Sequence, residues 1–130
     1  MAGGPTAWMS KRQTIVTTSS MESVYVACYH ATQKVSWKRA VLQEIDLGST
    51  DPTVIHIDNT SARSLTGNPV FRARSKHIDV KFHWLREKVA DGYVRLQYVP
   101  TNLQVTDVFT KALTGEAFHR HQCVLVCEPV

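Results

Sequence analysis

Three acidic residues stand where carboxylates could do chemistry together. Glu22 opens a segment with helical periodicity, Asp58 ends an apolar β-branched run, and Asp107 lies in a late amphipathic segment. Carboxylates that meet at the end of a sheet repel one another unless a cation lies between them, and Mg²⁺ takes such oxygen ligands. Bound there, it can activate water for cleavage of a phosphodiester. An Asp at a strand end is also a common helix cap or turn former, so the spacing alone leaves both interpretations open.

The elements expected to position these residues alternate between strand and helix. The patterns predict strands over 11–18, 53–58 and 93–99, and helices over 21–46, 60–66 and 77–90. Ser19 or Ser20 offers an N-cap oxygen for the first helix, and Asp91-Gly92 closes the third. A last helix is expected after Thr101, with Val105, Phe109 and Leu113 as its apolar stripe. This alternation predicts an α/β fold.

Composition sets the class of protein. The 130 residues are 43% hydrophobic and 20% charged, which predicts one globular domain and excludes wholesale disorder. No apolar run approaches the ~18 residues of a membrane span, and the N-terminus lacks the apolar core of a signal peptide. Three cysteines favour a reducing, intracellular setting, in the cytoplasm or nucleus. The net charge of +4 permits a polyanionic partner without demanding one.

Several longer words carry a resemblance. The strings IDNTSARSLTGNPVFRARSKHIDVKFHWLREKV and YVPTNLQVTDVFTKAL, with AWMSKRQTIVTTSS before the first helix, resemble the ribonuclease H domain of copia-type retrotransposon polyproteins. The resemblance covers residues 6–113 and leaves 114–130 as a divergent tail, so residues 1–113 are expected to form the domain. It implies a ribonuclease H-like mixed sheet flanked by helices. It also implies cleavage of RNA in RNA–DNA hybrids with two Mg²⁺ ions.

The family's four carboxylates transfer to this chain only in part. Asp58 and Asp107 match the third and fourth, so the resemblance implies that they hold metal. Nothing before Lys11 is acidic, so the first carboxylate and its strand are expected to be missing. The second carboxylate of the family belongs to a motif with two glutamates two residues apart. The corresponding residues of this chain are Glu22 and Val24. The broader pattern puts the catalytic Glu at position 24, so Glu22 is a third catalytic candidate that points ~200° away from that position.

Other residues suit contact with nucleic acid. Arg72, Arg74, Lys76 and Lys111 can meet phosphates, and Asn59 and Ser61 can reach a sugar hydroxyl or phosphate. His77 matches a recurrent family word and can contact substrate phosphate, or it is simply a histidine in the first turn of a helix. A zinc site at His119, His121, Cys123 and Cys127 has suitable ligand types at an unusual spacing. The segment CVLVC in that stretch also fits a strand.

The expected function follows from the resemblance and from its gaps. The chain is expected to descend from a ribonuclease H, with RNA–DNA hybrid as partner and Mg²⁺ as cofactor. With carboxylates missing, it is expected to be a truncated remnant with little activity. The alternatives are a non-catalytic nucleic-acid-binding module and a co-opted protein-interaction domain. Residues 53–58 should form a central strand, with the Asp58 and Asp107 carboxylates about 4–8 Å apart. An unpaired sheet edge should favour self-association, and no membrane partner is expected.

Overall fold

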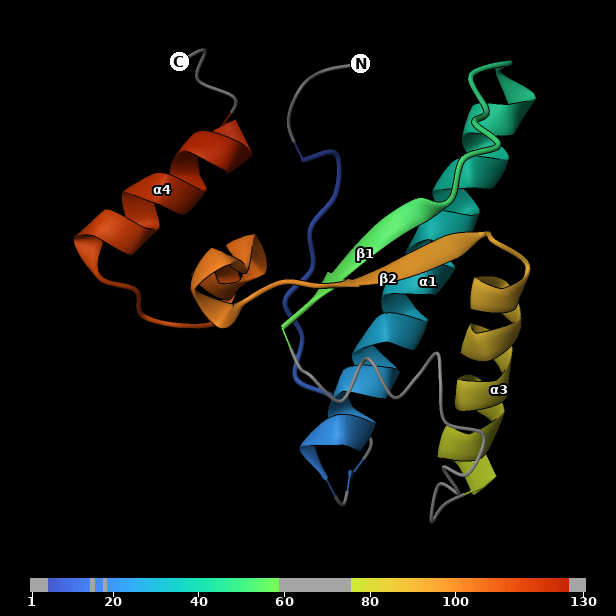
Figure 1. Ribbon diagram of the computed structural model, residues 1–130, viewed down its shortest axis with the longest axis horizontal. Coiled ribbons are helices and arrows are strands. Elements are labelled where there is room, and N and C mark those ends of the chain that lie inside the picture. Colours follow the sequence, from blue (N-terminus) through green and yellow to red (C-terminus); the bar gives the residue numbers. More distant parts are fainter. Residues whose placement is uncertain (1–4, 15, 18, 59–75, 127–130) are drawn as a thin grey trace.

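The structure is a computed structural model that describes residues 5–14, 16–17, 19–58 and 76–126. Its elements follow one another as α1 (Ser20–Glu44), β1 (Thr53–Ile57), α3 (Lys76–Ala90), β2 (Val94–Tyr98), two 3₁₀ turns η2 (Thr101–Leu103) and η3 (Val105–Phe109), and α4 (Gly115–Val126). The α/β class expected from the sequence is confirmed (Figure 1). No helix in the described part of the chain is both long enough and apolar enough to cross a membrane.

The sheet of the described residues consists of two parallel strands. β1 pairs with β2 in a register that runs from Thr53 opposite Val94 to Ile57 opposite Tyr98. Parallel neighbours need a crossover connection, and α3 lies within the connection between β1 and β2. The strand expected over 53–58 is confirmed and ends at Ile57. It is one of two strands in the described sheet, so the expectation of a central strand is not met there.

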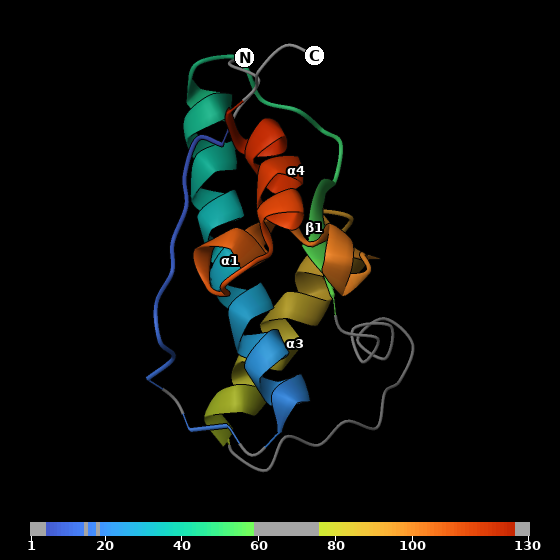
Figure 2. The same cartoon turned by 90° about the vertical axis from the view of Figure 1, so that its left-hand side faces the viewer.

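Two helices pack side by side and cover the sheet. Figures 1 and 2 show α1 and α3 next to each other, and their aromatic rings meet in edge-to-face contacts. The centroids of Tyr25 and Phe82 are 5.0 Å apart, and those of Tyr29 and Trp84 are 5.1 Å apart. α4 lies beyond the strands, on the side opposite to α3 (Figure 1). α4 therefore lies past the carboxyl ends of the strands, next to the 3₁₀ turns (Figure 1).

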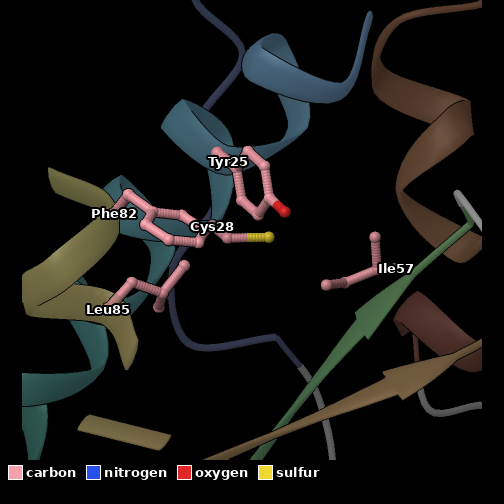
Figure 3. Close-up of a cluster of buried hydrophobic side chains, with 5 residues drawn as sticks. All are labelled: Tyr25, Cys28, Ile57, Phe82 and Leu85. Atoms are coloured by element: carbon pink, nitrogen blue, oxygen red, sulfur yellow. The ribbon is translucent and has the colours of Figure 1, made fainter. Parts of the chain in front are cut away.

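The core forms where these two helices meet the sheet. One cluster contains five buried side chains, from α1, α3 and β1: Tyr25, Cys28, Ile57, Phe82 and Leu85 (Figure 3). Partly buried side chains from α1 and both strands pack against it: Met21, Val24, Ile55 and Leu96. Burying a large apolar side chain contributes about 1.5–3 kcal/mol, so this cluster holds the layers together.

The ends of the long helices have specific caps. Ser19 is the N-cap of α1, and its hydroxyl accepts a hydrogen bond from the Glu22 amide at 3.2 Å. After α3, Gly92 has a φ of 69°, and the amides of Gly92 and Tyr93 bond back to the carbonyls of Val89 and Lys88. This pair of hydrogen bonds requires a residue in the left-handed conformation, which glycine adopts without strain. The predicted closure at Asp91-Gly92 is therefore confirmed.

Three expectations about local structure are corrected. Residues 11–18 were expected to form a strand, but the described residues there form none, and Gln13 and Thr17 instead hydrogen-bond to Ser23 of α1. The helix expected after Thr101 is two 3₁₀ turns, because its β-branched residues have low helix propensity. The strand interpretation of CVLVC fails because α4 continues to Val126. The helix expected over 60–66 lies outside the described residues.

Candidate acidic site at the end of the parallel sheet

Asp58 directly follows β1 and is partly buried. Ile57 before it belongs to the core, and the Ile57 carbonyl accepts a hydrogen bond from the Val99 amide at 2.9 Å. These contacts fix the chain on both sides of the strand end. Asp58 therefore lies at the carboxyl end of the parallel pair, where ligand sites of α/β sheets usually form.

Asp107 comes to the same end of the sheet through the 3₁₀ turns. β2 ends at Tyr98, and the chain then turns through η2 and η3. The Gln104 side-chain amide donates to the His56 carbonyl at 3.4 Å, which ties these turns to β1 two residues before Asp58. Asp107 lies in η3 and is only 8% exposed. A carboxylate this buried needs a partner, because desolvation penalises its charge.

Lys111 supplies that partner. Its Nζ lies 2.8 Å from Oδ2 of Asp107, and its amide donates to the Asp107 carbonyl, also at 2.8 Å. The hydrogen bond that Lys111 donates to Asp107 raises the pKa of Lys111, and the negative charges of Asp107 and Asp58 raise it further. Lys111 is therefore a cation throughout the neutral range. Because the charge of Asp58 also acts on it, Asp58 and Asp107 both lie within electrostatic range of one ammonium group.

The side chains of Glu22 and Val24 project from different sides of α1. Glu22 is 3% exposed in the first turn of the helix, near its N-cap. Val24 packs against the core cluster that contains Ile57, the neighbour of Asp58. Residues two apart on an α-helix point about 200° from each other, so the Glu22 carboxylate cannot take the place of a side chain at position 24. The position that the family pattern fills with a glutamate is therefore an apolar residue that packs against the core cluster.

The donor set does not fit a site for two divalent ions. In the part of the chain that the structure describes, no three His, Cys, Asp or Glu side chains come together as metal ligands. Asp58 and Asp107 are two suitable oxygen donors, but Oδ2 of Asp107 is already bound to the Lys111 ammonium. Mg²⁺ needs near-octahedral oxygen coordination and gives up its waters reluctantly. Among the described residues, this end of the sheet therefore offers two carboxylates, one of them paired with Lys111, without a group of three ligands.

The predicted nucleic-acid contacts are only partly described. Asn59, Ser61, Arg72 and Arg74 lie outside the described residues. Lys76 is exposed at the first residue of α3, where its ammonium is open to solvent anions. His77 is the second residue of that helix, as its first-turn interpretation required. The Lys111 ammonium forms an ion pair with the Asp107 carboxylate, so a phosphate would have to compete with that carboxylate for it.

The alternative zinc cluster is dispersed on α4. His119 and Cys123 are exposed and lie four residues apart, on one side of the helix. His121 is buried at 4% exposure and points about 200° away from His119. Cys127 lies outside the described residues. The helix therefore separates ligands that a strand or loop could have brought together.

Arg39 marks the opposite end of β1. Its guanidinium donates to the carbonyls of Asp51 and Ser49 at 2.6 and 2.7 Å and lies over the Tyr93 ring. A shallow surface depression there is lined by Arg39 and the loop that it holds. Because it borders the start of β1, it lies away from Asp58, and its arginine is already used in fixing the loop.

Two contributions at the site were missed from the sequence. The first is Gln104, because nothing in the local pattern signals its bond to a strand carbonyl 48 residues away. Lys111 was expected to meet phosphate. Its four-residue spacing from Asp107 is the spacing of an ion pair on one helical face, and this signal could have identified the pair.

Comparison with known proteins gives the chain its relatives. The retrovirus-related Pol polyproteins from transposons RE1 and RE2 of Arabidopsis thaliana are 38% and 37% identical to it over 114 residues. These matches cover 88% of this chain and 8% of each polyprotein. The Pol polyprotein from transposon TNT 1-94 of Nicotiana tabacum is 35% identical over 117 residues, which are 90% of this chain and 9% of the polyprotein.

No family model matches the chain, and no solved structure matches it. The chain spans less than a tenth of the length of the curated relatives that it matches. Within that span, more than a third of the aligned positions are identical in each of the three relatives. The chain is therefore homologous to one segment of retrovirus-related Pol polyproteins from plant transposons.

Proposed function

We propose that this chain is a ribonuclease H-like module derived from a retrotransposon Pol polyprotein, and that it has little hydrolytic activity of its own. Its partner is an RNA–DNA hybrid, which it meets at the sheet end that carries Asp58 and Asp107. The single observation that carries the proposal is that Asp58, directly after β1, and Asp107, in the turns that Gln104 ties to β1, lie at the same end of the sheet. They come from positions 49 residues apart in the sequence, and both match the family's words.

The fold supports this assignment of the site. A parallel β1–α3–β2 unit with Asp58 directly after its first strand, and a second carboxylate in the turns after β2, is what the ribonuclease H resemblance leads one to expect. The homology to Pol polyproteins supports a retroelement origin. Together they favour a hybrid-handling module over an unrelated α/β domain.

The same site explains why hydrolysis should be weak. Asp107 is bound to Lys111, and Val24 is an apolar residue where the family pattern has a glutamate. Two divalent ions carry four positive charges, whereas Asp58 and Asp107 supply two negative ones, and one of those is already neutralised. No hydrolytic step can be derived through ions that these residues do not hold.

The test is cleavage of an end-labelled RNA–DNA hybrid by the purified chain, with Mg²⁺ or Mn²⁺ present. We expect product formation to be indistinguishable from that of Asp58→Asn, which keeps the shape of the side chain and removes its charge. Asp91→Asn is the matched control, because Asp91 is an exposed carboxylate at the other end of the sheet. Cleavage by the wild type and by Asp91→Asn, clearly above that of Asp58→Asn, would contradict the proposal of weak activity.

A second candidate function is nucleic-acid binding without cleavage, and the surface of α3 favours it. The Lys81 ammonium lies 5.3 Å from the centre of the Tyr29 ring, and the Lys88 ammonium lies 5.8 Å from the centre of the Trp84 ring. Basic groups beside aromatic rings suit a polyanion with flat bases.

Fluorescence anisotropy with the same hybrid separates these functions. Binding that weakens steeply with added salt, without cleavage, supports a binding module, because the affinity then comes from phosphate contacts. The double substitution Lys81→Gln with Lys88→Gln should reduce the salt slope, whereas Lys34→Gln with Lys38→Gln on α1 serves as a control of equal charge change. No binding even at low salt favours the protein-interaction alternative.

A further inference from the structure

The acidic site contains its own cation. The Lys111 Nζ contacts Oδ2 of Asp107 at 2.8 Å, and the Asp107 side chain is only 11% exposed whereas that of Lys111 is 50% exposed. The backbone reinforces the pairing, because the Lys111 amide donates to the carbonyl of the same aspartate. The ammonium is therefore paired with the carboxylate through one side-chain bond, and the backbone bond closes the turn that brings Lys111 next to Asp107.

The position of this ammonium matters for any second cation. A divalent ion that used Asp107 would have to share Oδ2 with the Lys111 ammonium or displace that ammonium. Charges of like sign at contact distance repel strongly where water is partly excluded. The charge of Asp58 also raises the pKa of Lys111, after the larger effect of the hydrogen bond to Asp107.

We propose that Lys111 is a built-in counter-cation that keeps divalent metal ions from Asp107. The proposal rests on the proposed function only for the choice of Asp58 and Asp107 as the site. It assigns to Lys111 a role opposite to that of a phosphate-binding lysine, since its charge is used within the protein. It also explains the weak hydrolysis by the positive charge of Lys111.

The experiment uses Mn²⁺ as the probe and the full chain as the protein. Mn²⁺ is titrated against ¹⁵N-labelled protein, and paramagnetic broadening is followed at the amides of Ile57, Asp58 and Asp107. We expect the wild type to show no selective broadening over the Mn²⁺ titration. Lys111→Met should show it at an Mn²⁺ concentration at least tenfold below the highest one at which the wild type shows none. Lys111→Arg is the matched control, because it keeps the positive charge and should behave like the wild type.

Two double variants test whether the signal comes from the acidic site. Adding Asp58→Asn to Lys111→Met should abolish the selective broadening, whereas adding Asp91→Asn should leave it unchanged. Circular dichroism of each variant checks that the fold is retained, and Lys111→Gln replaces Lys111→Met if that variant does not fold. Equal broadening of the wild type and Lys111→Met overturns the proposal, and so does the lack of selective broadening in both.

The outcome is distinguishable from the failure of the proposed function. Hybrid binding is measured separately, in EDTA, by anisotropy. If the chain binds no hybrid while Lys111→Met gains the Mn²⁺ signal, the proposed function fails and the role of Lys111 stands. If the chain binds hybrid while Lys111→Met and the wild type respond alike to Mn²⁺, the role of Lys111 fails alone.

Discussion

The rings of Tyr25 and Phe82 meet edge to face, with centroids 5.0 Å apart and planes inclined at 81° (Figure 3). This geometry places the positive edge of one ring against the negative face of the other, which is the favourable arrangement for an aromatic pair. Since Tyr25 lies on α1 and Phe82 on α3, the contact fixes the two helices against each other. The same helix pair supports β1, so the packing also sets where Asp58 emerges.

Removing the Phe82 ring should therefore destabilise the whole domain. Phe82 is 2% exposed, and truncating a buried Phe to Ala costs about 3–5 kcal/mol. We expect Phe82→Ala to lower the free energy of unfolding by that amount in urea denaturation. Val80→Ala on the same helix is the control, because Val80 is 66% exposed and its truncation should change stability by at most about 0.5 kcal/mol. Similar losses in the two variants would refute the packing argument.

Gly92 should be sensitive to any side chain. Its φ of 69° is in the left-handed region, where a Cβ costs about 1–2 kcal/mol, although no atom lies within 4 Å of a Cβ built there. Gly92→Ala is expected to destabilise the chain by that amount through backbone strain alone. Gly115→Ala is the matched control, since its Cβ would also meet nothing and its φ is not positive. Urea midpoints measure both, and equal midpoints would argue against strain at Gly92.

Asp46 offers a stabilising change at the end of α1. It has a φ of 57°, and the amides of Asp46 and Leu47 bond back to the carbonyls of Gln43 and Leu42, as at Gly92. Asp46→Gly should raise stability by about 0.5–1 kcal/mol, because glycine adopts this conformation freely. Asp46→Ala separates the causes, since it removes the charge near the negative helix end and keeps the Cβ. If Asp46→Gly is no more stable than Asp46→Ala, backbone strain is not the reason.

Cys28 should resist alkylation in the folded chain. Its burial raises the pKa of the thiol to about 12, so at pH 8 only about one molecule in ten thousand carries the reactive thiolate. Iodoacetamide should leave the tryptic peptide of residues 13–34 unmodified and should label the peptide of residues 121–130, where Cys123 is exposed. Mass spectrometry distinguishes the two peptides. In guanidinium chloride both should react, and fast labelling of Cys28 without denaturant would show that the core is open.

The outer edge of β1 should promote self-association. The Thr53 amide donates to the Tyr93 carbonyl, and the Ile57 carbonyl accepts from the Val99 amide, so both residues turn their backbone groups toward β2. Neighbouring residues of a strand direct these groups to opposite edges, so the backbone groups of Val54 point to the other edge of β1. An unpaired edge can pair with another copy. We expect light scattering to show a mass that grows with concentration, and Val54→Pro, which lacks an edge amide, to reduce it more than Val54→Thr. A wild type that stays monomeric at high concentration would contradict this.

Local sequence determined most of the elements. Periodicity located α1, α3 and both strands, because each presents one apolar face at the spacing of its own geometry. The closure at Gly92 followed from residue chemistry, since only glycine enters the left-handed region without strain. Asp58 and Asp107 were chosen as site residues from their place after a strand and from the words around them. These are short-range properties, and a single chain displays them before it folds.

Only the tertiary structure decided what the chosen residues meet. The stretch over 105–113 has a helical stripe, yet it forms a 3₁₀ turn tied to β1 through Gln104, because packing against a strand outweighs weak helix propensity. Val24 packs against the core cluster and Glu22 is buried in the first turn of the same helix, which follows from how α1 packs in the fold. The pair of Lys111 and Asp107 is local, but the charge of Asp58 acts on Lys111 only because the fold brings residues 58 and 107 to one end of the sheet. Electrostatic energy depends on distance in space, and the sequence specifies that distance only through the fold.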